Sequence, residues 1–156
     1  MNDTNFEAAK VVYDKLCEVF DKREIKYRKD DENMVVHLGI NGDDFPMDFI
    51  MIIDEKRQLM RLMSPLPFKM PEDKRMEGAI ATCAATYAIT EGSFDYDISD
   101  GTISFRMTAS FRESEIGEEL FMYMVAYSSA VVDEYNDKFF AVGKGLLSIS
   151  DYLENI

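Results

Sequence analysis

The chain is 156 residues long, which is the size of one ordinary domain. Its hydrophobic fraction of 47% and aromatic fraction of 12% exclude intrinsic disorder, because disordered chains are poor in apolar residues. The formal net charge of −13 argues against binding to nucleic acid and against docking on anionic lipid, because both carry negative charge. We therefore expect a single domain over residues 1–156 that buries its own hydrophobic core.

The first part of the chain combines a helical pattern with strand patterns. From Asn5 to about Glu24, apolar side chains recur at helical spacing, which predicts an amphipathic helix. Met34–Ile40 then alternates with the period of two that is typical of strands, and Met47–Ile53 forms the next strand. Asn41–Asp44 lies between them and contains the glycine and asparagine that favour a turn. The two strands are expected to be antiparallel neighbours.

A third strand is expected at Gln58–Ser64, after a charged turn at Asp54–Arg57. Ile25–Arg28 forms either a loop or a short edge strand. Pro65 and Pro67 should end the sheet at this point, because proline cannot donate a hydrogen bond to a neighbouring strand. Together these segments predict an antiparallel meander after the first helix.

The second helix is expected to begin at Pro71, since proline suits the first helical position, and to end near Glu91. Gly92 follows where a C-terminal cap belongs. The helix is rich in glycine and alanine, which allow another backbone to approach closely. Its larger apolar residues recur at helical spacing and are expected to pack in the core. This stripe consists of Met76, Ala79, Ile80, Cys83, Ala84 and Tyr87.

A hairpin and a long helix complete the chain. Phe94–Ser99 and Ile103–Thr108 alternate apolar and polar residues around Asp100–Gly101, which is a strong signal for a β-hairpin. A third helix is expected over Glu115–Val142, followed by one short helical turn. The order is helix, three strands, helix, two strands, helix. It predicts an α+β fold in which about five largely antiparallel strands pack with three principal helices.

The sequence contains no residue pattern that predicts catalysis or metal binding. His37 is the only histidine, so a site with two histidines is impossible, and we expect it partly exposed on a strand. Cys17 and Cys83 lie far apart and are interpreted as small core residues. We therefore expect no metal, no nucleotide, no other cofactor and no enzymatic activity. The alternative hypothesis is a small-molecule-binding or enzymatic domain that uses carboxylates near Asp95 and Asp97.

The second and third predicted strands are apolar on both sides, whereas an antiparallel sheet usually leaves one face polar and wet. A second apolar face needs a cover, because exposed apolar surface favours aggregation. The second helix, a second copy of the chain or a bound peptide could each provide that cover, and we favour a homodimer. The residues expected at this partner or dimer interface are Ile50, Ile52, Met60 and Leu62.

Four segments stand in a familiar order along the chain: Pro71–Glu72, Gly92–Phe94, Asp100–Arg106 and Val131–Tyr135. In this order they resemble the YbjN family of bacterial proteins, described as sensory-transduction regulators, and the type III secretion chaperone-like fold. The resemblance spans nearly the whole chain. Relatives often carry an asparagine late in the second helix, where this chain reads Ala84–Tyr87. The family supplies no catalytic residues that could be assigned here.

The resemblance implies a small acidic protein of the bacterial cytoplasm that is dimeric and holds another polypeptide. A cytoplasmic location is also expected because the N-terminal residues lack the pattern of a signal peptide. Our leading hypothesis is a non-enzymatic protein-binding module, chaperone-like or regulatory, whose partner is a protein or peptide. A domain that serves only as a structural part of a dimer is a third possibility.

Overall fold

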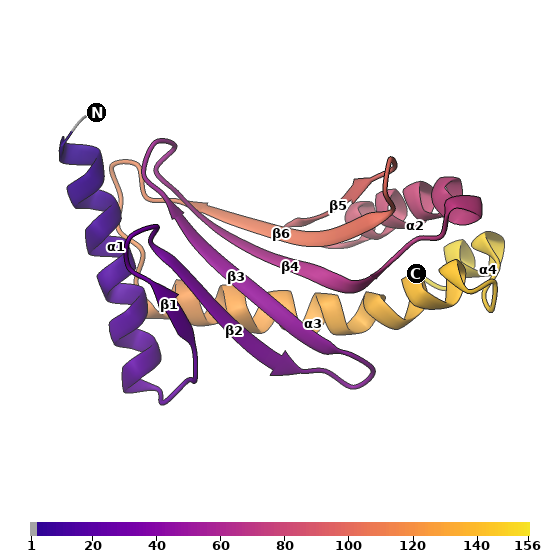
Figure 1. Cartoon of the computed structure of the whole chain (residues 1–156), viewed down its shortest axis with the longest axis horizontal. Coiled ribbons are helices and arrows are strands. Elements are labelled where there is room, and N and C mark those ends of the chain that lie inside the picture. The colour runs from indigo at the N-terminus through magenta and orange to yellow at the C-terminus, as the bar shows by residue number, and fades with distance from the viewer. Residues whose placement is uncertain (1–2) are drawn as a thin grey trace.

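The computed structural model describes residues 3–156 and shows an α+β fold, as the sequence predicts (Figure 1). Helix and strand bounds lie within a few residues of the expected ones, except at the end of the third strand of the meander. The elements in chain order are α1 (Asp3–Lys22), β1 (Arg28–Asp30), β2 (Val35–Asn41), β3 (Pro46–Asp54), β4 (Leu59–Lys69), the 3-10 turn η1 (Glu72–Lys74), α2 (Arg75–Ala88), β5 (Ser93–Asp97), β6 (Thr102–Ser110), α3 (Glu118–Gly143) and α4 (Ile149–Glu154).

The strands form one six-stranded antiparallel sheet in the order β1-β2-β3-β4-β6-β5. The predicted neighbours β2 and β3 pair from Val35 opposite Ile52 to Asn41 opposite Pro46. The strand beyond the five expected ones is β1, which begins at Arg28, the last residue of the segment left open as a loop or an edge strand. The antiparallel meander and the hairpin are therefore both confirmed.

The third strand of the meander does not end before the prolines. β4 continues through Pro65 and Pro67 to Lys69, so the expected end at Ser64 is wrong. Its pairing with β3 stops at Met63, whereas its pairing with β6 continues and shifts register between Pro65 and Lys69. A segment that is an edge on one side and irregularly paired on the other is a place where a sheet tolerates proline.

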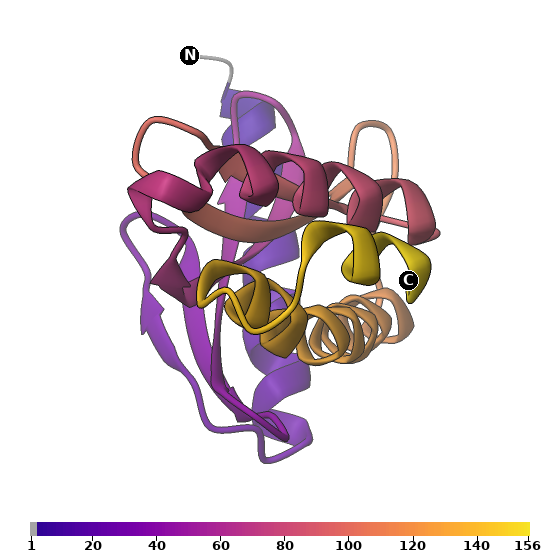
Figure 2. The same ribbon diagram turned by 90° about the vertical axis from the view of Figure 1, so that its right-hand side faces the viewer.

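Helices cover one face of the sheet, which we call the covered face. α1 and α3 contact each other and both contact β3, and Figure 2 shows the strands of the meander on one side of α3. The core side chains Phe49, Leu62 and Phe105 project from this face and are at most 1% exposed. Together with aromatic residues of α3 such as Phe139, they form the hydrophobic core.

α2 packs against β5 through its small residues. Gly78, Ala81, Thr82 and Ala85 are buried, and a Cβ at Gly78 would lie 2.6 Å from the hydroxyl of Tyr96. A larger residue at this position would therefore force the Tyr96 and Met70 side chains to shift, and glycine lets the helix pack closely on them. Because the small residues occupy the buried side, the larger residues of α2 lie on its outer side.

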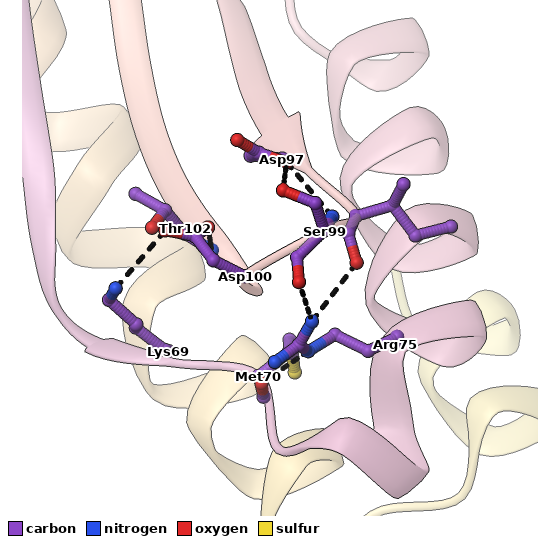
Figure 3. A network of polar contacts seen from close by, with 8 residues as sticks. Lys69, Met70, Arg75, Asp97, Ser99, Asp100 and Thr102 are labelled. Atoms are coloured by element: carbon purple, nitrogen blue, oxygen red, sulfur yellow. Dashed lines mark hydrogen bonds and ion pairs between the residues drawn. The ribbon is translucent and has the colours of Figure 1, made fainter.

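The β5–β6 hairpin is fastened to the start of α2 (Figure 3). The Arg75 guanidinium donates to the carbonyl of Met70 at 3.0 Å and to the carbonyls of Ile98 and Ser99 at 3.1 and 2.6 Å. Gly101 ends the turn with a φ of 78°, and a Cβ there would overlap the Met70 carbonyl oxygen. The glycine of the predicted Asp-Gly turn is thus required both by its backbone conformation and by close packing.

Candidate functional site

The candidate site is the face of the sheet opposite the covered face, and we call it the open face. No helix within residues 3–156 packs across it, and in Figure 1 β2, β3 and β4 lie in front of α3. Burial alternates along β3, so Ile50 and Ile52 point away from the buried Phe49 and Met51, as predicted. The centre of the open face is made of half-buried apolar side chains, which are Val35, Ile50, Ile52, Leu59 and Met63.

The strand register corrects two of the expected interface residues. Met60 and Leu62 are 0% exposed and pair with Ile53 and Met51 on the covered face, so they belong to the core. Across from Ile50 on the open face lies Met63 instead. Since Gln58–Ser64 is apolar on both sides, its pattern does not reveal which residues face the core, and only the pairing with β3 decides it.

Charged side chains interrupt and flank the apolar centre, because Arg61 lies between Leu59 and Met63 on β4, opposite Ile52 in the register. The Arg61 guanidinium lies 3.5 Å from the Asp54 carboxylate, and on β6 Arg106 lies 2.7 Å from Asp95. Partial burial by itself raises the pKa of Asp54, but hydrogen bonds from Arg57 and the positive charges of Arg57 and Arg61 outweigh it and hold this pKa below its usual range. These charged side chains of β3, β4, β5 and β6 on the open face are therefore paired with one another.

The β1 side of the open face is hollowed and lined by charged side chains that, within residues 3–156, form no ion pair with one another. A hollow of about 390 Å³ lies there, between the end of the loop after α1 and the middle of β2 and β3. Its charged lining consists of Lys26, Arg28 and Asp48, and His37 lies half-buried between Arg28 and Ile50 in the register. The predicted position of His37, partly exposed on a strand, is confirmed. The hollow joins the apolar centre at Ile50.

The outer side of α2 is a second apolar surface, which we call the α2 stripe. Met76, Ile80 and Tyr87 are 64%, 44% and 93% exposed, and Cys83 between them is exposed as well. The expectation that this stripe and Cys83 pack in the core is wrong, because α2 buries the opposite side, which carries Gly78 and the alanines. The small residues were the available signal: a run of them on one helix face favours close packing of that face.

The carboxylates of the alternative hypothesis do not converge in a cleft. Asp95 is bound to Arg106, and Asp97 accepts hydrogen bonds from the backbone N–H and hydroxyl of Ser99 at 2.9 and 2.6 Å. These bonds from Ser99 hold the pKa of Asp97 below its usual range. Both aspartates lie on the last strand of the sheet and serve an ion pair and a turn, whereas general acid–base catalysis favours a pKa near neutrality.

Two further features bear on the kind of site. Among residues 3–156, no group of three or more histidine, cysteine, aspartate or glutamate side chains is arranged to hold a metal ion. No helix in that part of the chain is long and apolar enough to cross a membrane.

Comparison with known proteins supports the fold. No protein-family model and no curated protein sequence matches this chain. Among solved structures, it is similar to "YbjN, a putative transcription regulator from E. coli", with a TM-score of 0.59 and 14% identity over 81% of this chain and 92% of that chain. It is also similar to a chain of the HopA1–SchA chaperone–effector complex, with a TM-score of 0.51 and 14% identity over 86% of this chain and 98% of that chain. The predicted resemblance to YbjN and to the secretion chaperone-like fold is thereby confirmed at the level of the fold.

Proposed function

We propose that this chain is a non-enzymatic protein-binding module, chaperone-like or regulatory, that holds a segment of another polypeptide on its open face. The observation that carries the proposal is the apolar centre of that face, which the helices leave uncovered. Ile50 and Ile52 are only partly buried, so covering their remaining apolar surface would stabilise a complex, by less than the roughly 1.5–3 kcal/mol for burying each side chain from full exposure. A bound polypeptide would provide that burial.

The structural neighbours support the same reading. One of them is a chain of a chaperone–effector complex, and another is described as a regulator. Proteins of this architecture can thus take part in binding another polypeptide. We also place the protein in the bacterial cytoplasm, in line with the resemblance described above.

We further propose that the protein is a homodimer, as expected from the sequence, but that its contact is the α2 stripe instead of the sheet face that the strand pattern favoured. Met76, Ile80, Cys83 and Tyr87 are spaced by four, three and four residues, which is the repeat of a helix that pairs with another helix. In an antiparallel pair related by a two-fold axis, Ile80 of one copy would face Cys83 of the other, and Met76 would face Tyr87. The stripe is therefore complementary to itself, and the sheet faces of both copies would stay available to a partner.

Affinity capture from the native cell tests the binding function. The baits are the wild-type chain, Ile52→Asp on the open face and, as a matched control, Val11→Asp on α1, where valine is 62% exposed. We expect the wild type and the control to retain the same proteins in quantitative mass spectrometry. Ile52→Asp should lose them, because a carboxylate in the apolar centre would be desolvated by the partner. Equal capture by all three baits would contradict the proposal.

A further inference from the structure

The hollow on the β1 side differs in charge from the rest of the molecule. The chain has a net charge of −13, yet the side chains that line the hollow include two cations, Lys26 and Arg28, and one carboxylate, Asp48. A cationic site attracts a negatively charged group of a ligand, whereas the rest of this acidic surface repels such a group. The hollow is therefore the part of the open face where charge can contribute most to specificity.

Its cations are also free to interact. Arg61 and Arg106, which lie on β4 and β6 of the open face, are already paired with Asp54 and Asp95. Lys26 and Arg28, in contrast, form no ion pair or side-chain hydrogen bond with the side chains described in residues 3–156. A new carboxylate at the hollow would thus gain charge-assisted hydrogen bonds without displacing an existing partner.

The strand register places the hollow beside the apolar centre. Arg28 lies opposite His37, and His37 lies opposite Ile50, so the three residues form one row across β1, β2 and β3. Adjacent strands are about 4.8 Å apart, which puts the Cα atoms of Arg28 and Ile50 about 10 Å apart. In an extended peptide, side chains two residues apart are separated by about 7 Å. Because the arginine side chain is long, its guanidinium can reach toward Ile50 and match this shorter distance.

We propose that the open face binds an extended peptide in which a carboxylate lies two residues from a large aliphatic side chain. The carboxylate enters the hollow between Lys26 and Arg28, and the aliphatic side chain packs on Ile50. This inference rests on the proposed function and adds the chemical class of the segment that is bound.

Selection from a displayed library of random 12-residue peptides tests it. The baits are the wild type, Arg28→Glu and the matched control Lys29→Glu, which makes the same charge change on the adjacent residue of β1. Lys29 pairs with Val36 in the register and therefore lies on the other side of the strand. We expect the wild type and the control to enrich Asp or Glu two positions from Ile, Leu, Val or Met, and Arg28→Glu to lose the acidic preference.

A binding cycle makes the test quantitative. An enriched peptide and its Glu→Gln version are titrated against the three proteins, and thermal melting verifies that each protein is folded. On the wild type and on Lys29→Glu the glutamine peptide should bind about fivefold more weakly, and on Arg28→Glu the two peptides should bind equally.

Two kinds of outcome would overturn the inference, and only one of them would also overturn the proposed function. Peptides that bind through Ile50 and Ile52 with no acidic preference, or a preference that persists on Arg28→Glu, would refute the assignment of the hollow alone. If no peptide is enriched on the wild type, the proposed function fails together with it.

Discussion

The covered and open faces of the sheet come from the same strands, and they differ in what the rest of the chain does with them. Along Phe49–Ile53 of β3 the residues alternate between full burial under the helices and partial burial at the surface, although all five are large and apolar. The covered face is fixed by α1, α2 and α3, whereas the open face keeps its apolar centre without any intramolecular partner within residues 3–156. The comparison teaches that apolar character alone does not identify the core of this fold. The helices decide which face is core, and the remaining face is available for binding.

The largest difference between the faces should appear in stability. Phe49→Ala removes a ring that is 1% exposed on the covered face and should lower the free energy of unfolding by roughly 3–5 kcal/mol. Ile50→Ala, one residue further on the open face, should cost less, roughly 1–2 kcal/mol, because Ile50 is only partly buried and its loss leaves no enclosed cavity. Urea denaturation followed by circular dichroism measures both. Equal losses would show that the open face is internal core.

The next prediction concerns the oligomeric state and tests whether the dimer contact lies on the α2 stripe or on the open face. Ile80→Asp should convert a dimer into a folded monomer, because the charge would lie in the centre of the helix pair. Ile52→Asp should leave the dimer intact. Light scattering with size-exclusion chromatography measures the mass of each. If the Ile52→Asp protein is monomeric and the Ile80→Asp protein is dimeric, the dimer contact lies on the sheet. If the wild-type protein is monomeric at high concentration, the homodimer is refuted.

A smaller effect is expected on the fold itself. Ile52→Asp should reduce the free energy of unfolding by only about 1 kcal/mol, since the new carboxylate can stay hydrated on the open face. The same change at Met51, which is 0% exposed, should prevent stable folding. Thermal melting of the two variants checks this prediction. A collapse of the Ile52→Asp protein would mean that another part of the chain covers this residue.

The smallest effect should depend on pH and concerns the ion pairs of Asp54 on the open face. The pKa of Asp54 is lower in the folded chain than in the unfolded chain, so its contribution to stability is present above its ordinary pKa and is lost as the pH falls through the folded value. Asp54→Asn should therefore cost less than about 1 kcal/mol near neutrality and reduce the loss of stability on acidification. Urea titrations at neutral and acidic pH test this. For Phe49→Ala the cost should not change with pH.

The outcome for individual segments shows which physical signals a sequence carries. Alternation along Met47–Ile53 predicted that Ile50 and Ile52 face away from the core, because the side-chain period of a strand is two. The same rule could not orient Leu59–Met63, since both of its sides are apolar and the register comes from pairing with another strand. The hollow also escaped prediction, because it joins the loop before β1 to β2 and β3.

α2 shows a further limit. Its pattern places Met76, Ile80 and Tyr87 on one side of the helix, but the expected position of that side in the core is wrong, because the opposite, glycine- and alanine-rich side packs on β5. For a short helix with two apolar sides, close backbone approach competes with burial of large side chains. In this fold α2 packs closely through Gly78, and its large residues Met76, Ile80 and Tyr87 stay exposed.

The outermost strand β1 has a consequence for how the protein meets other chains. It is only three residues long, each of them is charged and all are exposed: Arg28, Lys29 and Asp30. Such a strand is a poor template for the addition of further strands, since a newcomer would gain few backbone hydrogen bonds and would have to accommodate three charges. This protection against strand addition covers β2 at Val35–His37, the residues with which β1 pairs. A peptide bound as we propose would therefore lie on the open face and would not extend the sheet at β1.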